Sequence, residues 1–264
     1  MGEILEAILL GIVQGLTEFL PVSSSGHLEI AKVLLQDDSL DNQSLFTTVL
    51  LHFATALSTL VVFRKDIWDI INRSIKKEGK DARKFIIYII ISMIPAVLVG
   101  LTMEETIESL FSKNLLLVAG MLFITGVLLF IADRSYDNQK PVRGASSFVI
   151  GISQAIAILP GISRSGATIS AALLLGISRH EAAQFSFLMV VPVIFGKIAK
   201  DLIDGSFFTD MPSIGYSIAG FFAAFITGYF ACTWMIKLVK QAGLKYFAYY
   251  CFIVVFIIFG FHFL

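Results

Sequence analysis

Charged side chains are scarce in this chain of 264 residues. Asp, Glu, Lys and Arg together make up 15% of the sequence, whereas hydrophobic residues make up 56%. A soluble domain of this length cannot bury so much apolar surface, so the composition excludes an ordinary soluble protein. The mean hydropathy of +0.83 indicates a polytopic membrane protein instead. The formal net charge is zero, and we expect no nucleic-acid partner.

Cysteine is nearly absent as well. Cys232 and Cys251 lie far apart within apolar runs. We interpret both as small buried hydrophobic residues rather than as a disulfide or a metal pair. No cleavable signal peptide is evident, because no basic segment precedes the first apolar run and that run leads straight into polar residues.

Six apolar runs are long enough to cross a bilayer as helices, which takes about 17 to 20 residues for a hydrocarbon core of roughly 30 Å. Three of them lie in each half of the chain. They are Leu45–Phe63, Phe85–Leu101, Leu115–Ala132, Ala182–Leu202, Ile214–Ile236 and Tyr246–Leu264.

Two further hydrophobic regions are each interrupted in the middle. Residues 3–35 are broken at Pro21–Gly26, and residues 145–178 are broken at Pro160–Gly166. The arms of the second region have only about 11 to 15 residues, which at 1.5 Å per residue reach about halfway across the membrane. We therefore predict two re-entrant helix–loop–helix hairpins, whose irregular tips are buried in protein or line a wet cavity.

Charges of opposite sign are segregated along the chain. Fifteen of the 20 Lys and Arg residues fall in residues 64–84, 134–143 and 237–245 or at Arg179. Acidic residues gather instead at 37–41, 104–108 and 201–210. By the positive-inside rule the basic side is cytoplasmic, so we expect both the N-terminus and the C-terminus to lie outside.

The two hairpins repeat each other's sequence. Gly11–Gln14 recurs as Gly151–Gln154, and Ser23–Gly26 recurs as Ser163–Gly166, both 140 residues later. Three spanning segments follow each hairpin, and because three is odd the second copy enters from the opposite face. The prediction is an all-α membrane protein with an inverted-topology repeat, whose hairpin tips meet near the membrane midplane. It is a single domain, 1–264, with repeat halves 1–135 and 136–264.

The first hairpin tip brings a carboxylate, hydroxyls and an imidazole together. Gln14 and Glu18 are four residues apart and share one face of the entering helix. Ser23 and Ser24 precede His27 by four and three residues, so a hydroxyl can lie beside the imidazole as a nucleophile beside its base. The start of the next helix offers backbone N–H groups to an anion. Polar groups at membrane depth are costly, which makes this segment a candidate site.

The second tip adds Arg164, which is flanked by Ser163 and Ser165 and followed by Gly166 and Thr168. A guanidinium group is permanently charged and presents a planar fork that suits phosphate. Together, the facing tips offer two helix starts, one arginine, several hydroxyls, an imidazole and a carboxylate. This set predicts a phosphoryl group as the ligand.

Simpler interpretations stay open for each residue taken singly. A serine at a tip is as consistent with turn formation and helix capping as with catalysis. Glu18 and Arg164 could form a structural ion pair, and His27 could be a satisfied buried histidine. His52, inside the first spanning run, either lines the site or packs. We assign no role to His180 and His262.

At both tips the chain resembles the undecaprenyl-diphosphatase family of membrane enzymes, which is associated with bacitracin resistance. Gln14–His27 matches a signature of Glu or Gln, three residues, Glu, and a Pro-Val-Ser-Ser-x-Gly-His turn. Pro160–Thr168 matches the signature Pro-Gly-x-Ser-Arg-Ser-Gly-Ala-Thr. The resemblance implies hydrolysis of undecaprenyl diphosphate to undecaprenyl phosphate and inorganic phosphate at the outer side of the bacterial cytoplasmic membrane. This reaction recycles the lipid carrier for peptidoglycan synthesis.

The resemblance also implies roles for individual residues. Ser24 matches the nucleophile, His27 its proton-transfer partner and Arg164 the phosphate clamp. Glu18 and Gln14 match a pair linked to a divalent cation, Mg²⁺ or Ca²⁺. A neutral amide is a poorer ligand than a carboxylate, so we expect Glu18 and substrate oxygens to hold the metal. The expected catalytic residues are Ser24, His27, Glu18 and Arg164; the expected substrate-binding residues are Gln14, Thr17, Ser23, Ser25, Gly26, Ser163, Ser165, Gly166, Thr168 and His52.

Some questions stay open at this point. The phosphate passes either to Ser24 or directly to a water held at His27. A polyprenyl-phosphate transporter or flippase is the alternative function, because inverted repeats with broken helices are typical of transporters. The set of Ser24, His27 and Glu18 favours a hydrolase, since a carrier needs no nucleophile. We expect bacitracin to compete by sequestering the substrate, and a homodimer stays open.

Overall fold

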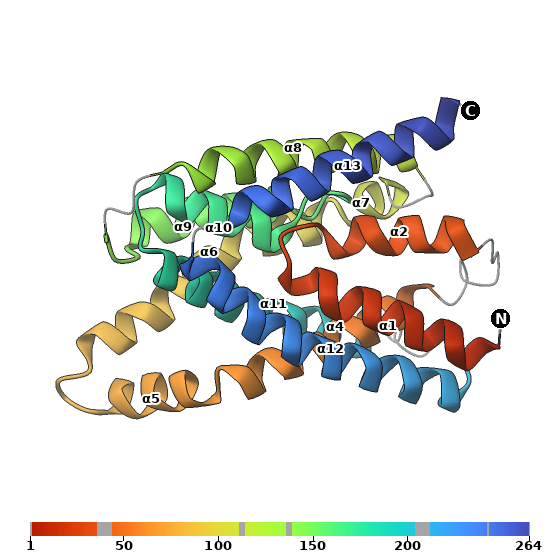
Figure 1. Ribbon diagram of the computed structural model, residues 1–264. Coiled ribbons are helices and arrows are strands. Elements are labelled where there is room, and N and C mark those ends of the chain that lie inside the picture. The colour runs from red at the N-terminus through yellow and green to blue at the C-terminus, as the bar shows by residue number, and fades with distance from the viewer. Residues whose placement is uncertain are drawn as a thin grey trace.

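The computed structural model describes residues 2–35, 44–110, 114–135, 139–203, 212–241 and 243–263. The described elements are helices, and both chain ends lie on the side of the bundle opposite α5 (Figure 1). They are α1 (Glu3–Phe19), α2 (Ser24–Leu35), α4 (Ser44–Val62), α5 (Arg64–Ile75), α6 (Lys80–Thr102), α7 (Glu104–Leu110), α8 (Leu115–Asp133), α9 (Gly144–Ile156), α10 (Arg164–Leu174), α11 (Arg179–Ile203), α12 (Ile214–Lys240) and α13 (Leu244–Phe263). The acidic segments 37–41 and 204–210 lie outside the described residues.

The helices confirm a polytopic membrane protein. Five of them are long and apolar enough to cross a bilayer: α6, α8, α12, α13 and residues Arg179–Lys200 of α11. The remaining predicted run, Leu45–Phe63, forms α4, which passes the same test only together with α5, and the two helices are bent by 68° at their junction. The described residues therefore contain five candidate spans, or six when the bent pair counts as one.

Helix α5 is not predicted from the sequence, in which residues 64–84 stand out only by their basic side chains. Arg64–Ile75 is helical and has no buried residue. Its Trp68, Ile71 and Ile75 recur at helical spacing and stay exposed, at 67%, 44% and 79%. Arg83 closes the turn that follows by donating to the backbone oxygens of Ser74 and Lys76, both at 2.8 Å. The basic segment is thus an ordered helical hairpin that continues into α6.

The two interrupted regions form helix–turn–helix hairpins, as predicted. Helices α1 and α2 are separated by residues 20–23, and α9 and α10 by residues 157–163. Each turn contains one residue in the left-handed region, Ser23 with φ 70° and Gly161 with φ 96°. Glycine adopts this region freely, whereas a serine there costs about 1–3 kcal/mol. The first hairpin therefore carries backbone strain at Ser23 that the second avoids.

Each hairpin packs against a helix from the other half of the chain. Gly11 of α1 lies so close to α12 that an added Cβ would come within 2.5 Å of the Gly220 carbonyl oxygen. Gly151 of α9 meets Ser92 of α6, where an added Cβ would lie 2.9 Å from the Ser92 Cα. This reciprocal packing of α1 on α12 and α9 on α6 is what an inverted repeat requires. The repeat relation itself stays a prediction.

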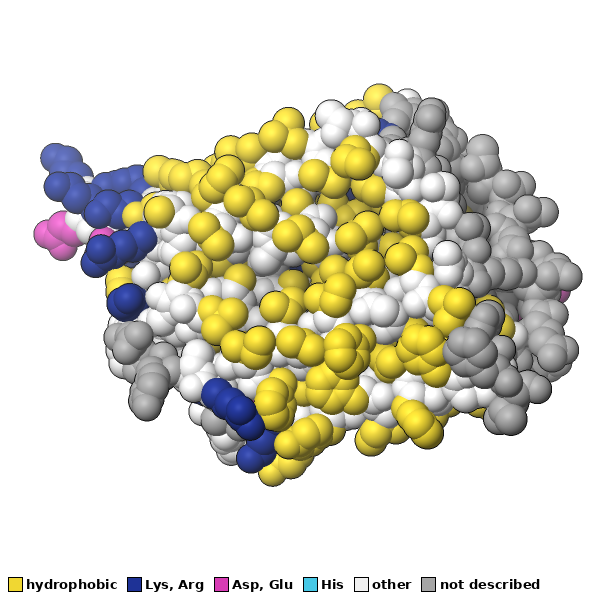
Figure 2. Space-filling model, turned by 90° about the horizontal axis from the view of Figure 1, so that it is seen from above, with side chains coloured by type: hydrophobic (Ala, Val, Ile, Leu, Met, Phe, Trp, Pro, Cys, Tyr) yellow, Lys and Arg dark blue, Asp and Glu magenta, His cyan; other side chains and the backbone are white. Residues whose placement is uncertain are grey.

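An aromatic core lies beneath the hairpin turns. The Phe19 ring at the end of α1 stands edge-on to Phe187 of α11, with 5.7 Å between ring centroids, and Phe185 makes the same kind of contact with Phe85 of α6. These α11 rings are fully buried. Outward-facing side chains are largely apolar over the middle of the molecule (Figure 2), as a lipid-facing surface requires.

Both cysteines are free and buried, as the sequence predicted. Cys232 lies in α12 and Cys251 in α13, and each has a relative exposure of 0%. The Cys251 thiol lies 4.0 Å from the backbone oxygen of Pro21. They act as small packing residues, and one of them supports the first hairpin turn.

Candidate active site

The two hairpin tips are in direct contact, and an ion pair joins them. Nη2 of Arg164, the first residue of α10, lies 2.6 Å from Oε1 of Glu18 near the end of α1. The Ser165 hydroxyl donates to the backbone oxygen of Leu20 at 3.4 Å. The side chains of Glu18 and Arg164 are only 7% and 15% exposed. A carboxylate and a guanidinium from opposite halves of the chain thus share one buried site.

Glu18 is the centre of this site. Its Oε2 atom accepts hydrogen bonds from the Gln14 amide at 3.0 Å and from the Ser24 hydroxyl at 2.8 Å. Nε2 of His52, on α4, lies 3.6 Å from the same oxygen. Of the two interpretations of His52, the structure supports a residue that lines the site. The buried carboxylate is satisfied on both oxygens, which is the condition for keeping a charge at this depth.

Arg164 is held on its other side by α11. Its Nη1 donates to the backbone oxygen of Ser186 at 3.3 Å. The Ser186 hydroxyl lies 2.6 Å from that of Thr168, which also donates to the Arg164 backbone oxygen at 2.8 Å. Ser186 received no role from the sequence. The sequence does contain a signal for this role, since Ser186 is the lone hydroxyl residue of an apolar helix and lies between two buried phenylalanines.

The repeated serines make the same contacts in both tips. The hydroxyl of Ser23 accepts from the Gly26 N–H at 3.2 Å, and that of Ser163 accepts from the Gly166 N–H at 3.1 Å. Each also lies 3.3 Å from the hydroxyl two residues later, Ser25 in the first tip and Ser165 in the second. These serines cap the helices that start there, so the capping interpretation describes Ser23 and Ser163.

Ser24 and His27 are arranged differently from the expectation. The sequence spacing placed a serine hydroxyl beside the imidazole, but the Ser24 hydroxyl donates to Glu18 instead. Both ring nitrogens of His27 have other partners: Nδ1 lies 2.8 Å from the Ser23 backbone oxygen, and Nε2 lies 2.8 Å from the hydroxyl of Tyr250 in α13. The imidazole thus turns back by one helical turn toward the Ser23 carbonyl.

Thr17 is expected at the site, but its hydroxyl bonds within its own helix rather than to the other site residues. Its hydroxyl donates to the backbone oxygen of Val13 at 2.6 Å, one turn earlier in α1. This bond satisfies the hydroxyl within its own helix. The side chain is buried, at 8% exposure, so Thr17 packs beside the site rather than pointing into the Glu18 network.

The donor set next to Glu18 fits a hard cation in part. Oε1 of Gln14 is buried and has no hydrogen-bond partner among the described residues, while the amide nitrogen of the same side chain donates to Glu18. A free oxygen beside a carboxylate suits Mg²⁺ or Ca²⁺, whose preferred ligands are oxygens. No group of three His, Cys, Asp or Glu residues that could hold a metal occurs in the described parts of the chain. Phosphate oxygens would have to complete such a site.

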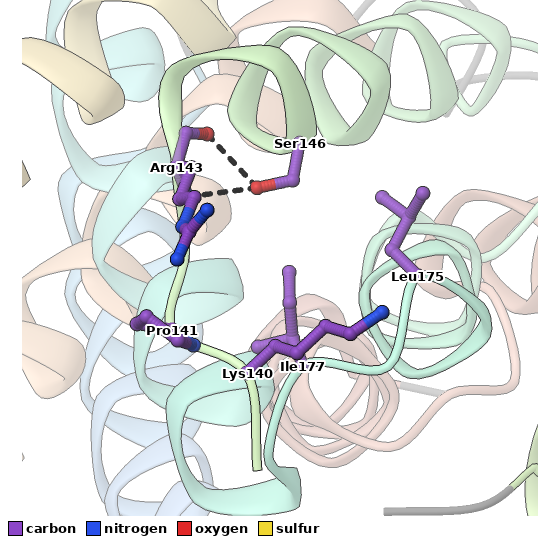
Figure 3. Close-up of a pocket in the computed structure, with 6 residues that line it drawn as sticks. All are labelled: Lys140, Pro141, Arg143, Ser146, Leu175 and Ile177. Atoms are coloured by element: carbon purple, nitrogen blue, oxygen red, sulfur yellow. Dashed lines mark hydrogen bonds between the residues drawn. The ribbon is translucent and has the colours of Figure 1, made fainter. Parts of the chain in front are cut away.

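A separate pocket lies at the base of the second hairpin, where α9 begins and α10 ends (Figure 3). It has a volume of about 290 Å³ and contains none of the expected site residues. The Ser146 hydroxyl at its rim bonds the backbone of Arg143 rather than an open position. Its lining residues are Lys140, Pro141, Arg143, Ser146, Leu175 and Ile177.

Comparison with known proteins identifies the family of the chain. The family model described as bacitracin resistance protein BacA matches residues 7–257 of the chain. The chain belongs to this family. The resemblance carried by the two tip motifs is therefore confirmed.

Named relatives of the family align over almost the whole chain. An undecaprenyl-diphosphatase from Christiangramia forsetii is 58% identical over 252 residues, which cover 96% of each chain. A protein of the same name from Bacteroides fragilis is 44% identical over 257 residues, again 96% of each chain. One from Methanobrevibacter smithii is 40% identical over 273 residues, 97% of each chain.

Proposed function

We propose that this protein hydrolyses undecaprenyl diphosphate to undecaprenyl phosphate and inorganic phosphate. The observation that carries the proposal is the contact of three groups at the joined tips. The Ser24 hydroxyl donates to Glu18 at 2.8 Å, and Glu18 is paired with Arg164 at 2.6 Å. A nucleophile, a carboxylate and a phosphate-binding cation thus stand together in a buried site. The relatives' shared name supports a diphosphatase and does not favour the transporter alternative.

The site binds a phosphate by exchanging ion-pair partners. The guanidinium of Arg164 presents a fork that matches two phosphate oxygens. When the terminal phosphate takes this fork, Glu18 loses its cationic partner and becomes free to accept a proton. Helices α2 and α10 both start at the tips, and the backbone N–H groups of a helix start favour a nearby anion.

Ser24 then acts as the nucleophile. Its oxygen bonds to the terminal phosphorus, the bond from that phosphorus to the bridging oxygen breaks, and undecaprenyl phosphate leaves. The hydroxyl proton passes to Oε2 of Glu18, the atom that already accepts its hydrogen bond. This step differs from the sequence-based expectation, in which His27 takes the proton from Ser24.

Water completes the reaction. Its oxygen bonds to the phosphorus of the seryl ester, its proton passes to Nε2 of His27, and the bond to Ser24 breaks. Glu18 returns its proton to the serine oxygen, and inorganic phosphate leaves. His27 then gives its proton to bulk water, which restores the site. Glu18, Gln14 and phosphate oxygens would hold a divalent cation, whose chemistry is to neutralise the charge of the diphosphate.

The distribution of basic side chains indicates on which side of the membrane the reaction takes place. Lys and Arg side chains gather at the end of the molecule where α5 lies (Figure 2), and the chain ends lie opposite (Figure 1). We infer that the α5 end is cytoplasmic and that the site opens to the outer side of the bacterial cytoplasmic membrane. Bacitracin would then act by sequestering the lipid diphosphate before it reaches Arg164.

A phosphate-release assay on undecaprenyl diphosphate tests the proposal. The purified protein in detergent should release one phosphate per substrate, chelator should slow the release, and added Mg²⁺ or Ca²⁺ should restore it. Ser24→Ala should reduce turnover by a factor of about 10³ or more, because it removes the nucleophile. Absence of phosphate release with metal present would refute the diphosphatase, and near-parental turnover of Ser24→Ala would refute the covalent route.

A further inference from the structure

Tyr250 contacts the active-site histidine from the last helix of the chain. Its hydroxyl lies 2.8 Å from Nε2 of His27. The two rings are stacked, with centroids 5.6 Å apart and an angle of 14° between their planes. No sequence motif pointed to Tyr250, which stands beside Tyr249 in the apolar run of α13.

The partners of His27 determine which nitrogen carries the proton. Nδ1 lies 2.8 Å from the backbone oxygen of Ser23, and a carbonyl oxygen can only accept a hydrogen bond. Nδ1 is therefore the donor, and in the neutral ring Nε2 carries the lone pair. It follows that the Tyr250 hydroxyl donates to Nε2.

Three contacts thus fix the imidazole. The Ser23 carbonyl holds one nitrogen, the Tyr250 hydroxyl holds the other, and the stacked tyrosine ring restrains the plane. The same Ser23 oxygen also accepts the backbone N–H of His27, at 3.1 Å. The left-handed backbone of Ser23, with φ 70°, sets the direction of the chain at this carbonyl. The strain noted at this residue therefore lies in the segment that sets the histidine tautomer.

We propose that Tyr250 is a positioning residue. Its hydroxyl holds the His27 ring in the tautomer whose basic atom is Nε2, and it stays hydrogen-bonded to Nε2 until a water molecule replaces it. This inference rests on the proposed function, in which Nε2 accepts the proton of the attacking water. The water reaches Nε2 only where the Tyr250 hydroxyl now stands. Tyr250 is 42% exposed, so its ring can move aside without leaving a buried cavity.

Tyr250→Phe is the decisive variant, because phenylalanine keeps the stacked ring and removes only the hydroxyl. Tyr249→Phe is the matched control, since its ring contacts Phe130 at 6.2 Å. The ¹⁵N NMR spectrum of histidine-labelled protein in detergent reports the proton on each ring nitrogen. The chain has four histidines, and His27→Gln identifies the His27 signals by their loss.

In the parental protein we expect a protonated Nδ1 and an unprotonated, hydrogen-bonded Nε2 at His27. Tyr250→Phe should shift the Nε2 signal, whereas Tyr249→Phe should not. A protonated Nε2 in the parental protein, or an Nε2 chemical shift that stays the same in Tyr250→Phe, overturns the inference. This readout needs no turnover, so it stays decisive even when the proposed diphosphatase activity fails.

Kinetics provides the second readout. Tyr250→Phe should lower kcat about three- to tenfold, the loss that one hydrogen bond of ordinary strength produces. KM should stay within about twofold, because Tyr250 does not hold the diphosphate. An unchanged kcat together with the expected NMR shift would overturn the functional part of the inference and leave Tyr250 as a packing residue.

Discussion

Gln154 stands in the second hairpin where Gln14 stands in the first, but the two buried amides have different surroundings. The amide nitrogen of Gln14 donates at 3.0 Å to Glu18, four residues later. The residue four positions after Gln154 is Ile158, and neither amide atom of Gln154 has a hydrogen-bond partner within the part of the chain that is described. The first hairpin uses its glutamine, whereas the second only buries it.

Replacing each glutamine by methionine tests this difference between Gln14 and Gln154. Gln154→Met should raise the free energy of unfolding by about 1–3 kcal/mol, the cost of an unpaired buried polar group, and leave activity unchanged. Gln14→Met should lower phosphate release about tenfold or more, because Glu18 loses a donor. Thermal unfolding in detergent and the phosphate assay measure both. A marked loss of stability in Gln154→Met would show that this amide is satisfied by bound water.

Arg164→Lys tests the bridge between the hairpins. A lysine keeps the charge but cannot contact Glu18 and the Ser186 backbone oxygen together, as the two guanidinium nitrogens do. We expect turnover to fall about ten- to a hundredfold, the loss of a charge-assisted hydrogen bond. Arg143→Lys, at the exposed base of the second hairpin, is the control and should match the parent. Equal activity of both variants would remove Arg164 from the mechanism.

Close packing of α1 on α12 can be tested at its glycines. A Cβ at Gly15 would lie 2.7 Å from the Ala224 backbone oxygen, where nothing can give way. Gly15→Ala should therefore lower the unfolding temperature and, by displacing Glu18, the activity. Gly120→Ala in α8 has nothing within 4 Å and should stabilise by about 0.5–1 kcal/mol. The difference between the two variants is the expected result, and similar unfolding temperatures would contradict it.

The orientation in the membrane can be measured by cysteine labelling. The native thiols of Cys232 and Cys251 are buried and should react only after unfolding. In a variant with both replaced by alanine, a cysteine at Lys77 should be labelled by an impermeant reagent only from the cytoplasmic side, and one at Gly2 only from outside. Labelling of both positions from the same side would contradict the proposed topology.

The spanning helices could be predicted from the sequence because apolar length is nearly all that a bilayer requires. The run Leu115–Ala132 became α8 with one residue more. Helix α5 was missed because its five apolar residues are interspersed with charged and polar ones and none of them is fully buried. The same limit applies to its bend of 68° against α4, which no local pattern indicates.

Only those residues of the candidate site that belong to the two tip motifs could be predicted from the sequence. Glu18, Ser24 and Arg164 belong to the two tip motifs, and they are in contact. Tyr250 and Ser186 lie outside those motifs in apolar helices, and their place at the site follows from how α13 and α11 pack on the tips. The spacing of Ser24 and His27 allowed a direct contact, but Glu18 and the Ser23 carbonyl offered each of them a stronger partner.

The contact of α1 with α12 also sets the order in which this protein can be assembled. The first hairpin leaves the ribosome long before Gly220 and Ala224, against which its glycines pack, and before Tyr250, which holds His27. Contacts so distant in sequence form late and slowly. During insertion, Glu18 therefore has no Arg164 to pair with until the second half of the chain has been made. A chain released early would carry the serine and the carboxylate, but no closed site around them.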